Sequence, residues 1–349
     1  MLPIRSTPNT HLSNRIRTTC WCQKLPPGLS ASHTSSHVSG DFQQNDSKEG
    51  FIISSMPVNS QVLTSSGFGV ELQSLDIANL DDDGAAEILD HFYQAGGLLV
   101  VRNQQHISRR QLAGFIALFG SVELNEKYNP AFLEPGYPEL LRIGNTKKDG
   151  DYNALFIQAD PAPLMWHTDD SFRHPQPIGS CLFCLKTPPA GGDTGFAGMQ
   201  AAYEALPQNT REQIDDLEAI HSYDYLNELL RKTNPHRPPL SDELKKQLPP
   251  IKRPLVAQHP VSGKKGLYIP LSHIESIPGL TDAQTRNLLD QLIDHMTQAQ
   301  FTHMHHWKPG DLVVWDNRSA MHAPTPFDDQ KYQRLMYRLT FNGAQILGF

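Results

Sequence analysis

The tripeptide that begins at His167 has the residue types of a metal site. If the stretch 166–171 is a β-strand or the end of one, its period of two places the imidazole of His167 and the carboxylate of Asp169 on one face. One more neutral imidazole would complete a set of two histidines and one carboxylate, and our candidate for it is His322. Such a set leaves one face of the metal open and is the geometry associated with non-haem Fe(II) oxygenases.

These histidines also allow simpler interpretations. A His close to an Asp is usually a hydrogen-bonded pair at the surface, and the tripeptide alone does not separate the two cases. The third imidazole could instead come from the group of His303, His305 and His306, although a solvated strand end explains that group. We expect His221 to be a local hydrogen-bonding residue.

Two arginines recur on a later predicted strand, 334–341. The period of two places Arg334 and Arg338 on one face and the large apolar residues on the other. The arginine face either meets water or lines a cavity, and inside a cavity two guanidiniums are costly to bury unless carboxylates meet them. One dicarboxylate ligand would saturate one guanidinium at its distal end, so the second guanidinium predicts a further anion, the substrate.

Helices and strands alternate before and after these residues. Capping residues and apolar periodicity predict helices over 81–95, 108–120, 199–206, 210–220 and 281–298. Alternation and turn residues predict strands over 98–102, 140–143, 179–185, 301–306, 312–315 and 334–341. Many short strands with helices in the connections predict a mainly β (α+β) fold, a double-stranded β-helix or jelly-roll barrel with helical cover.

Two segments fall outside this pattern. Residues 1–55 are rich in Ser, Thr, Asn, His and Pro and predict a disordered tail. An organelle transit peptide is the alternative, and Met56 could equally be the true start. Residues 225–254 contain six prolines and many charges, which predicts a lid-like insertion without a core element. The rest of 56–349 is then a single domain.

The composition argues against several classes of partner. The 349 residues include 30 Lys and Arg against 37 Asp and Glu, a formal charge of −7, without a basic block that could track a phosphate backbone. No apolar run approaches the roughly 18 residues needed to span a bilayer. We therefore expect a small-molecule substrate, no nucleic acid and no membrane, and a homo-oligomer stays open.

The cysteines indicate a reducing compartment. The chain has four of them, Cys20, Cys22, Cys181 and Cys184, too few and too unevenly placed for a secreted disulfide framework. We therefore expect a cytoplasmic protein. Residues 181–184 form a C-x-x-C, but positions i and i+3 of a strand face opposite ways, so we expect two thiols in the core.

Together these motifs resemble the taurine dioxygenase family of Fe(II)- and 2-oxoglutarate-dependent oxygenases, which includes the aryloxyalkanoate dioxygenases. The resemblance runs from about Gly67 to Gly343 and agrees with the jelly-roll prediction. It rests on four ordered motifs: His167-Thr168-Asp169, Gly191-Gly192-Asp193-Thr194, Trp315-Asp316-Asn317-Arg318 followed by His322, and Gln333-Arg334-Leu335-Met336-Tyr337-Arg338. The loop 259–268 is similar too, with a less specific role.

The resemblance implies a role for each matching residue. His167, Asp169 and His322 match the iron ligands of the family. Thr194 matches a hydroxyl that meets the carboxylate of 2-oxoglutarate, and Arg334 matches the partner of its distal carboxylate.

The resemblance also implies a substrate pocket. Arg338 matches an arginine near the substrate, and Tyr128 matches a tyrosine of the pocket. Asn125 stands where taurine dioxygenase has a histidine that grips sulfonate, so taurine itself is in doubt. An amide suits a carboxylic acid or an amino acid better than a sulfonate.

The reaction implied by the resemblance uses Fe(II), 2-oxoglutarate and O2. It releases succinate and carbon dioxide and oxidises an aliphatic C–H bond, with hydroxylation as the default outcome and desaturation or ring formation as alternatives. A non-catalytic metal-binding or small-molecule-binding protein on the same fold is the rival class. A zinc hydrolase with the same ligands would give Arg334 no role.

Overall fold

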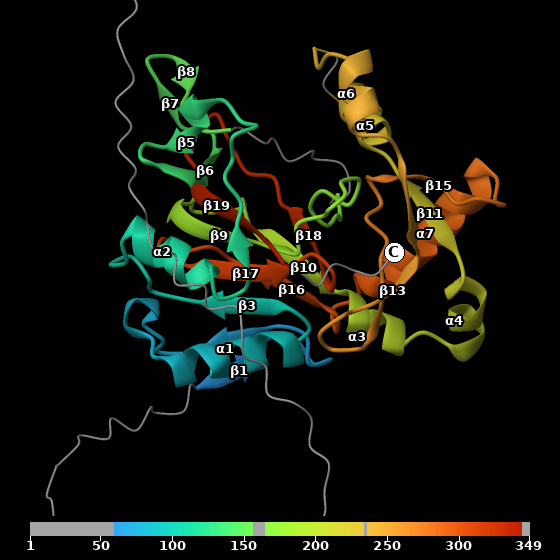
Figure 1. Cartoon of the computed structure of the whole chain (residues 1–349), viewed down its shortest axis with the longest axis horizontal. Coiled ribbons are helices and arrows are strands. Elements are labelled where there is room, and N and C mark those ends of the chain that lie inside the picture. The colour runs from blue at the N-terminus through green and yellow to red at the C-terminus, as the bar shows by residue number, and fades with distance from the viewer. Residues whose placement is uncertain (1–58, 156–164, 234–235, 344–349) are drawn as a thin grey trace, which may run out of the picture. The chain divides into compact units, whose positions relative to one another are not determined.

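A nine-stranded sheet contains β19, the strand that includes Arg338 and directly follows Arg334 (Figure 1). The computed structural model describes residues 59–155, 165–233 and 236–343. The strands of this sheet follow the order β1-β2-β3-β17-β9-β19-β6-β5, and β4 also pairs with β19. Their bounds are β1 Ser60–Val62, β2 Val70–Leu72, β3 Leu98–Val101, β4 Ser121–Val122, β5 Leu133–Glu134, β6 Tyr137–Gly144, β9 Gly179–Lys186, β17 Leu312–Asp316 and β19 Leu335–Asn342.

The two faces of β19 belong to different apolar clusters. Tyr337, Leu339 and Phe341 pack with residues of helices α1 (Asp82–Gln94) and α2 (Arg109–Ile116). Met336, on the opposite face, packs with Val313 in a second apolar cluster, which also contains Leu182, Phe196 and Trp315. Arg334, which precedes β19, and Arg338 line one cavity together with Leu182 of the same cluster as Met336, so both arginines face the interior. This part of the strand prediction is confirmed.

A three-stranded sheet lies against that inner face. β10 (Thr194–Gly198) pairs on one side with β16 (Thr302–His305) and on the other with β18 (Ala320–Pro324). Phe196 of β10 packs against Trp315 of β17, with ring centroids 5.6 Å apart. The two sheets therefore share one apolar layer.

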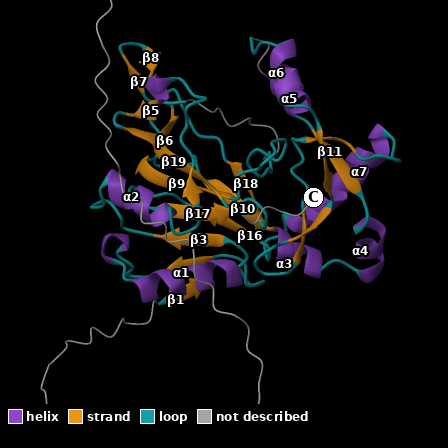
Figure 2. Cartoon of the chain, viewed as in Figure 1, coloured by secondary structure: helices purple, strands orange, loops and turns teal. Residues whose placement is uncertain are grey.

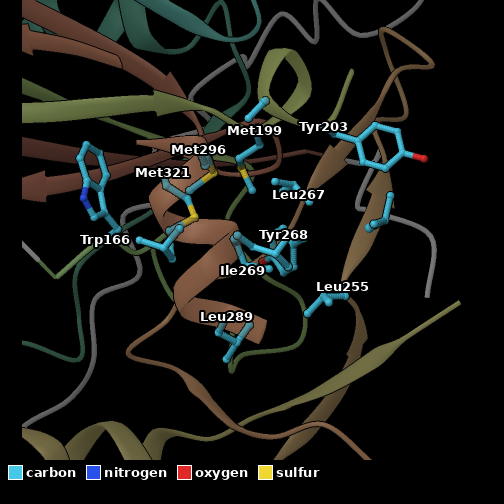
Figure 3. Packing of buried hydrophobic residues seen from close by; sticks show 14 of the residues in the cluster. Trp166, Met199, Tyr203, Leu255, Leu267, Tyr268, Ile269, Leu289, Met296 and Met321 are labelled. Carbon is cyan, nitrogen blue, oxygen red and sulfur yellow. The ribbon is translucent and has the colours of Figure 1, made fainter. Parts of the chain in front are cut away.

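Most of the remaining helices gather around a second three-stranded sheet, β12-β11-β15 (Figure 2). The further bounds are α3 Met199–Glu204, α4 Gln208–Ile214, α5 Tyr223–Thr233, α6 Asp242–Gln247, α7 Asp282–Met296, η1 Ile77–Asn79, η2 Pro130–Phe132, β7 Lys147–Lys148, β8 Asp151–Tyr152, β11 Glu218–His221, β12 Ile251–Pro254, β13 Val256–Gln258, β14 Lys265–Leu267 and β15 Ile274–Ser276. Figure 3 shows Met296 of α7 beside Met321 of β18 in a third cluster. Helix α7 is thereby packed against the strand that contains His322.

Capping residues mark the helices that the sequence predicts. The side chain of Asp81 caps α1, and Ser108 forms a capping box with Gln111 at the start of α2. The box predicted between Thr281 and Gln284 begins α7. These helix starts are confirmed, as are the strands that correspond to β3, β6, β9, β16, β17 and β19.

Three predictions about elements are wrong. The stretch 166–171 is not a strand, because only His167 forms a bridge and a turn follows it. The helix predicted over 210–220 ends at Ile214, since 218–221 pairs as β11 between β12 and β15. The segment 225–254, expected to contain no core element, contains most of α5, all of α6 and β12. Its prolines at 249 and 250 lie outside these elements, and the leucines of α5, at helical spacing, are half-buried.

Some predictions concern residues that are not described. The tail 1–55, including Cys20 and Cys22, lies outside the described residues. In the described ranges, no helix is both long enough and apolar enough to cross a membrane. Cys181 and Cys184 are free, buried and in different clusters, which confirms the prediction of two core thiols. Burial raises the pKa of each thiol to about 12.

Candidate active site

His167 and His322 lie side by side because their backbones pair. The N–H of His167 donates to the carbonyl of His322 at 3.0 Å, and the N–H of His322 donates to the carbonyl of His167 at 2.8 Å. Their ring centroids are 4.2 Å apart. His322 belongs to β18, the edge strand of the sheet β16-β10-β18, and this strand positions its imidazole. A single bridge to β18 positions the imidazole of His167.

Asp169 completes the group from a turn. One ligand atom each from His167, Asp169 and His322 lie within 4.8 Å of one another, and the described ranges contain no second His, Cys, Asp or Glu group of this kind. The turn is anchored to the chain after β17, because Thr168 Oγ1 donates to the carbonyl of Asn317 at 2.7 Å. The carboxylate therefore reaches the imidazoles without the strand that we expected.

The two carboxylate oxygens of Asp169 have different surroundings. Oδ2 accepts from Ser180 Oγ at 2.7 Å and lies 3.1 Å from Arg338 Nη2. Oδ1 lies 3.9 Å from His322 Nε2. Burial alone would raise the pKa of Asp169, but Arg338 and the two imidazoles hold it well below its usual range. The carboxylate is thus ionised, with one oxygen bound by protein donors and the other facing the imidazoles.

Both imidazoles are suited to bind a cation. His167 Nδ1 lies 2.8 Å from the carbonyl of Met165. A carbonyl can only accept, so Nδ1 is the donor in this contact and Nε2 is the nitrogen left for a metal. Burial, together with His167, lowers the pKa of His322 to about 3, so its ring is neutral at pH 7. Two imidazoles and one carboxylate fit Fe(II) better than they fit a structural metal, since no fourth ligand among the described residues closes the group.

A cavity of about 140 Å³ adjoins these three residues. It combines apolar walls with a few polar groups, as small-molecule sites do. Its lining residues are Ile143, His167, Asp169, Leu182, Thr194, Trp315, His322, Pro324, Arg334 and Arg338. The structure therefore brings six of the eight predicted site residues to one cavity.

Arg334 faces this cavity without an acidic partner among the described residues. Its Nε donates to the carbonyl of Gly192 at 2.9 Å, and its backbone N–H donates to Asn145 Oδ1 at 2.8 Å. Burial lowers the pKa of Arg334 to about 10, although Cys184 and Asp193 act in the opposite direction. A guanidinium that is partly buried beside a cavity and has no carboxylate of its own in the described chain fits an anionic ligand.

Arg338 has a different environment, and it corrects one step of the sequence argument. We expected Arg338 to need a counter-charge from a ligand, but Asp169 supplies one. Burial alone would lower the pKa of Arg338, and the carboxylate of Asp169 raises it instead. Arg338 Nε is buried and has no hydrogen-bond partner in the described chain. One donor of Arg338 is therefore left unpaired by the described residues.

Asn125 and Tyr128 are not among the lining residues of the cavity. Asn125 is buried, and its Nδ2 donates to the carbonyl of Glu139 at 2.8 Å. The N–H of Tyr128 donates to the carbonyl of Asn125 at 3.0 Å. Burial raises the pKa of Tyr128, and the charge of Arg338 acts against it, so the phenol senses the charges of the site. Their predicted place in a substrate wall stays a prediction.

The competing histidines lie elsewhere. His305 Nε2 is 3.2 Å from Asp311 Oδ2, and His306 Nδ1 is 2.8 Å from Asp193 Oδ2. His305 is fully buried, so a solvated strand end does not explain it. None of the group, including His303, joins a three-residue cluster that could hold a metal ion in the described part of the chain.

Ser171 connects two buried histidines near the site, and one of them was missed. Its Oγ lies 2.9 Å from His221 Nδ1 and 2.8 Å from His273 Nδ1. The partner of His221 is thus 50 positions away in the chain and not local. The ring of His273 lies 6.1 Å from that of His167. No pattern in the sequence marks His273, because only the fold places it there.

Asp316 supports the connection between β17 and β18. It accepts from Arg318, whose Nη2 lies 2.6 Å from Oδ2, and His259 Nε2 lies 3.0 Å from the same oxygen. Burial alone would raise the pKa of Asp316, but Arg318 and His259 lower it to about 2. The motif that begins at Trp315 and the loop at His259 therefore share a structural role in positioning the strand with His322.

Known proteins with similar sequences point to one family. Residues 59–340 match the family described as Taurine catabolism dioxygenase TauD, TfdA family. The alpha-ketoglutarate-dependent 2,4-dichlorophenoxyacetate dioxygenase of Cupriavidus pinatubonensis is 31% identical over 285 residues, 80% of this chain and 96% of that protein. The (S)-phenoxypropionate/alpha-ketoglutarate-dioxygenase of Sphingobium herbicidovorans is 32% identical over 79% of this chain and 92% of that protein. Pentalenolactone F synthase of Streptomyces arenae is 30% identical over 66% of this chain and 78% of that protein.

Solved structures agree with this result. The crystal structure of AAD-2 in complex with Mn(II) and N-oxalylglycine has a TM-score of 0.67 and 29% identity, over 84% of this chain and 100% of that one. A taurine dioxygenase from Burkholderia xenovorans has a TM-score of 0.66 and 26% identity, over 84% and 92%.

Proposed function

Because the chain belongs to the taurine catabolism dioxygenase TauD, TfdA family, we propose that it hydroxylates an aliphatic C–H bond of a small carboxylic or amino acid. The chain is a 2-oxoglutarate-dependent dioxygenase, and its cofactors are Fe(II), 2-oxoglutarate and O2. Succinate and carbon dioxide are the products of the co-substrate.

Each residue of the cavity has a task in this proposal. His167, Asp169 and His322 would hold the iron, which when bound supplies the oxidising chemistry that side chains lack. The hydroxyl of Thr194 would bind a carboxylate of 2-oxoglutarate, and the guanidinium of Arg334 would bind its distal carboxylate. The apolar wall that includes Leu182, Trp315 and Ile143 would keep water from the reacting atoms.

The observation that supports an anionic substrate is the free donor of Arg338. Its Nη2 is paired with Asp169, while its buried Nε lacks a partner in the described residues and would bind a carboxylate beside the metal site. The names of two relatives specify carboxylates, 2,4-dichlorophenoxyacetate and phenoxypropionate. Tyr128 and Asn125 would form the opposite wall, and the amide of Asn125 favours a carboxylate over a sulfonate.

The finer architecture is part of the proposal. The two sheets that share an apolar layer support a jelly-roll within a single domain over 56–349, with 225–254 as a lid-like insertion. Desaturation or ring formation is the alternative outcome, supported by the similarity to pentalenolactone F synthase, because the same residues would serve it.

Arg338→Lys is expected to raise the KM for a carboxylate substrate about 10- to 100-fold, the cost of charge-assisted hydrogen bonds made by the guanidinium fork. Lysine keeps a cation beside Asp169, so iron should still bind. Steady-state kinetics with 2,4-dichlorophenoxyacetate as the probe would measure the change, with bound iron quantified in parallel.

The amide of the same probe is the matched control. It lacks the charge that Arg338 would bind, so Arg338→Lys should change its KM by less than about twofold. An equal loss for acid and amide, or full activity of the variant on the acid, would contradict a carboxylate contact at Arg338 and leave the family assignment intact.

A further inference from the structure

Trp307 lies directly behind Thr194. Its indole Nε1–H donates to Thr194 Oγ1 at 3.0 Å, and both side chains are buried. Thr194 is in β10, where its backbone pairs with His305 on one side and Pro324 on the other. The position of the hydroxyl is therefore set by two neighbouring strands and one indole.

This hydrogen bond restricts the directions in which the hydroxyl proton can point. An indole N–H is a donor only, so Thr194 Oγ1 must accept from Trp307. A hydroxyl has one proton, and no acceptor for the proton of Thr194 is present among the described residues. Thr194 also lines the cavity that contains Arg334. The proton is thus free to point into the cavity.

We propose that Trp307 is a positioning residue for the co-substrate: its indole N–H fixes the Thr194 hydroxyl as a donor toward the cavity, where a carboxylate of 2-oxoglutarate would accept it. An anion needs donors, and a free hydroxyl could equally turn a lone pair toward it. The indole occupies one of the two lone pairs and keeps the proton from pointing toward Trp307, so it favours the orientation in which the hydroxyl donates into the cavity. The inference rests on the proposed function, because it assumes that Thr194 and Arg334 bind 2-oxoglutarate.

The surroundings of Trp307 keep its ring in place. Its ring packs edge-on against His305, with centroids 4.4 Å apart. His305 in turn lies 3.2 Å from Asp311, whose Oδ2 also accepts from the N–H of Lys308 at 2.9 Å. The indole is held by packing against His305 and by the turn that ends at the buried Asp311, so its N–H is already oriented before a ligand binds.

The test is a double-mutant cycle on 2-oxoglutarate binding. Trp307→Phe removes the N–H and keeps an aromatic ring, while Thr194→Val removes the hydroxyl and keeps its shape. The Kd for 2-oxoglutarate would be measured by calorimetry on the anaerobic, Mn(II)-loaded protein for the native chain, both single variants and the double variant. If Trp307→Phe does not fold, 3-benzothienylalanine at position 307 replaces the N–H with sulfur at nearly the same shape.

We expect Trp307→Phe to weaken 2-oxoglutarate binding about three- to tenfold in the native background, the effect of one hydrogen bond. In the Thr194→Val background the same change should alter the Kd by less than about twofold. Equal losses in both backgrounds would show a packing role and overturn the inference, as would an unchanged Kd in the native background. If Thr194→Val and Arg334→Ala also leave the Kd unchanged, the proposed co-substrate site fails with it.

Discussion

His322→Ala is expected to abolish Fe(II) binding and turnover while the chain still folds. The variant removes one of the three candidate ligands found among the described residues. Loss of a residue that supports a ligand costs about 10- to 100-fold in metal affinity, and loss of the ligand itself should cost more. The His322 side chain makes no hydrogen bond through its buried Nδ1, so the folded protein loses packing and no bond. Iron content of the purified protein and succinate formation would be measured, with circular dichroism to show that the fold persists.

His303→Ala is the matched control for this variant. His303 belongs to the alternative group at 303–306, and its Nε2 is buried without a hydrogen-bond partner among the described residues. It should keep native iron content and turnover, because it lies outside the cluster around His167. If His322→Ala retained iron and His303→Ala lost it, the third ligand would have to be assigned to the group at 303–306.

Arg334→Ala is expected to weaken 2-oxoglutarate binding by about 2–5 kcal/mol, or roughly 30- to 5,000-fold in Kd. The guanidinium is partly buried, has no carboxylate of its own in the described chain and lines the cavity, so its removal leaves the ligand without its counter-charge. The free energy of unfolding should not fall by a comparable amount, since no ion pair within the protein is broken. Calorimetry on the Mn(II)-loaded protein would give the Kd, and urea unfolding would give the stability.

Arg338→Lys is the control for Arg334→Ala, because Arg338 lies on the same face of β19 and is already paired with Asp169. It should leave 2-oxoglutarate binding within about twofold of the native value. An unchanged Kd in Arg334→Ala together with a large loss in Arg338→Lys would assign the co-substrate to Arg338.

Local patterns predict those parts of the site that lie on regular strands. The period of two along β19 separates the arginines from Tyr337, Leu339 and Phe341, and the two sets do meet different surroundings. The pattern works because β19 is paired on both sides within the sheet, so its faces cannot rotate. Capping residues identify α1, α2 and α7 for a similar reason, since a cap acts within one helical turn.

The features that sequence reasoning missed depend on contacts between distant segments. β18 has no alternation of polar and apolar residues, and 320–323 are all buried; it is a strand because it pairs with β10 and forms a bridge to His167. The partner of Arg338 is Asp169, which lies in a turn held by the chain after β17. Neither contact has a signal within a window of ten residues, so the charge balance of the cavity could not be predicted.

The most direct test of the proposed activity is the amount of succinate released when the native protein turns over a panel of small carboxylates, sulfonates and amino acids. The panel would include 2,4-dichlorophenoxyacetate, with a cationic and a neutral analogue of each anion. We predict that succinate forms only with Fe(II), 2-oxoglutarate and O2, that a carboxylate or amino acid stimulates it most, and that succinate and hydroxylated product form in equal amounts. Absence of iron-dependent succinate with every compound would contradict the oxygenase, and strongest stimulation by a cation would contradict the anionic substrate.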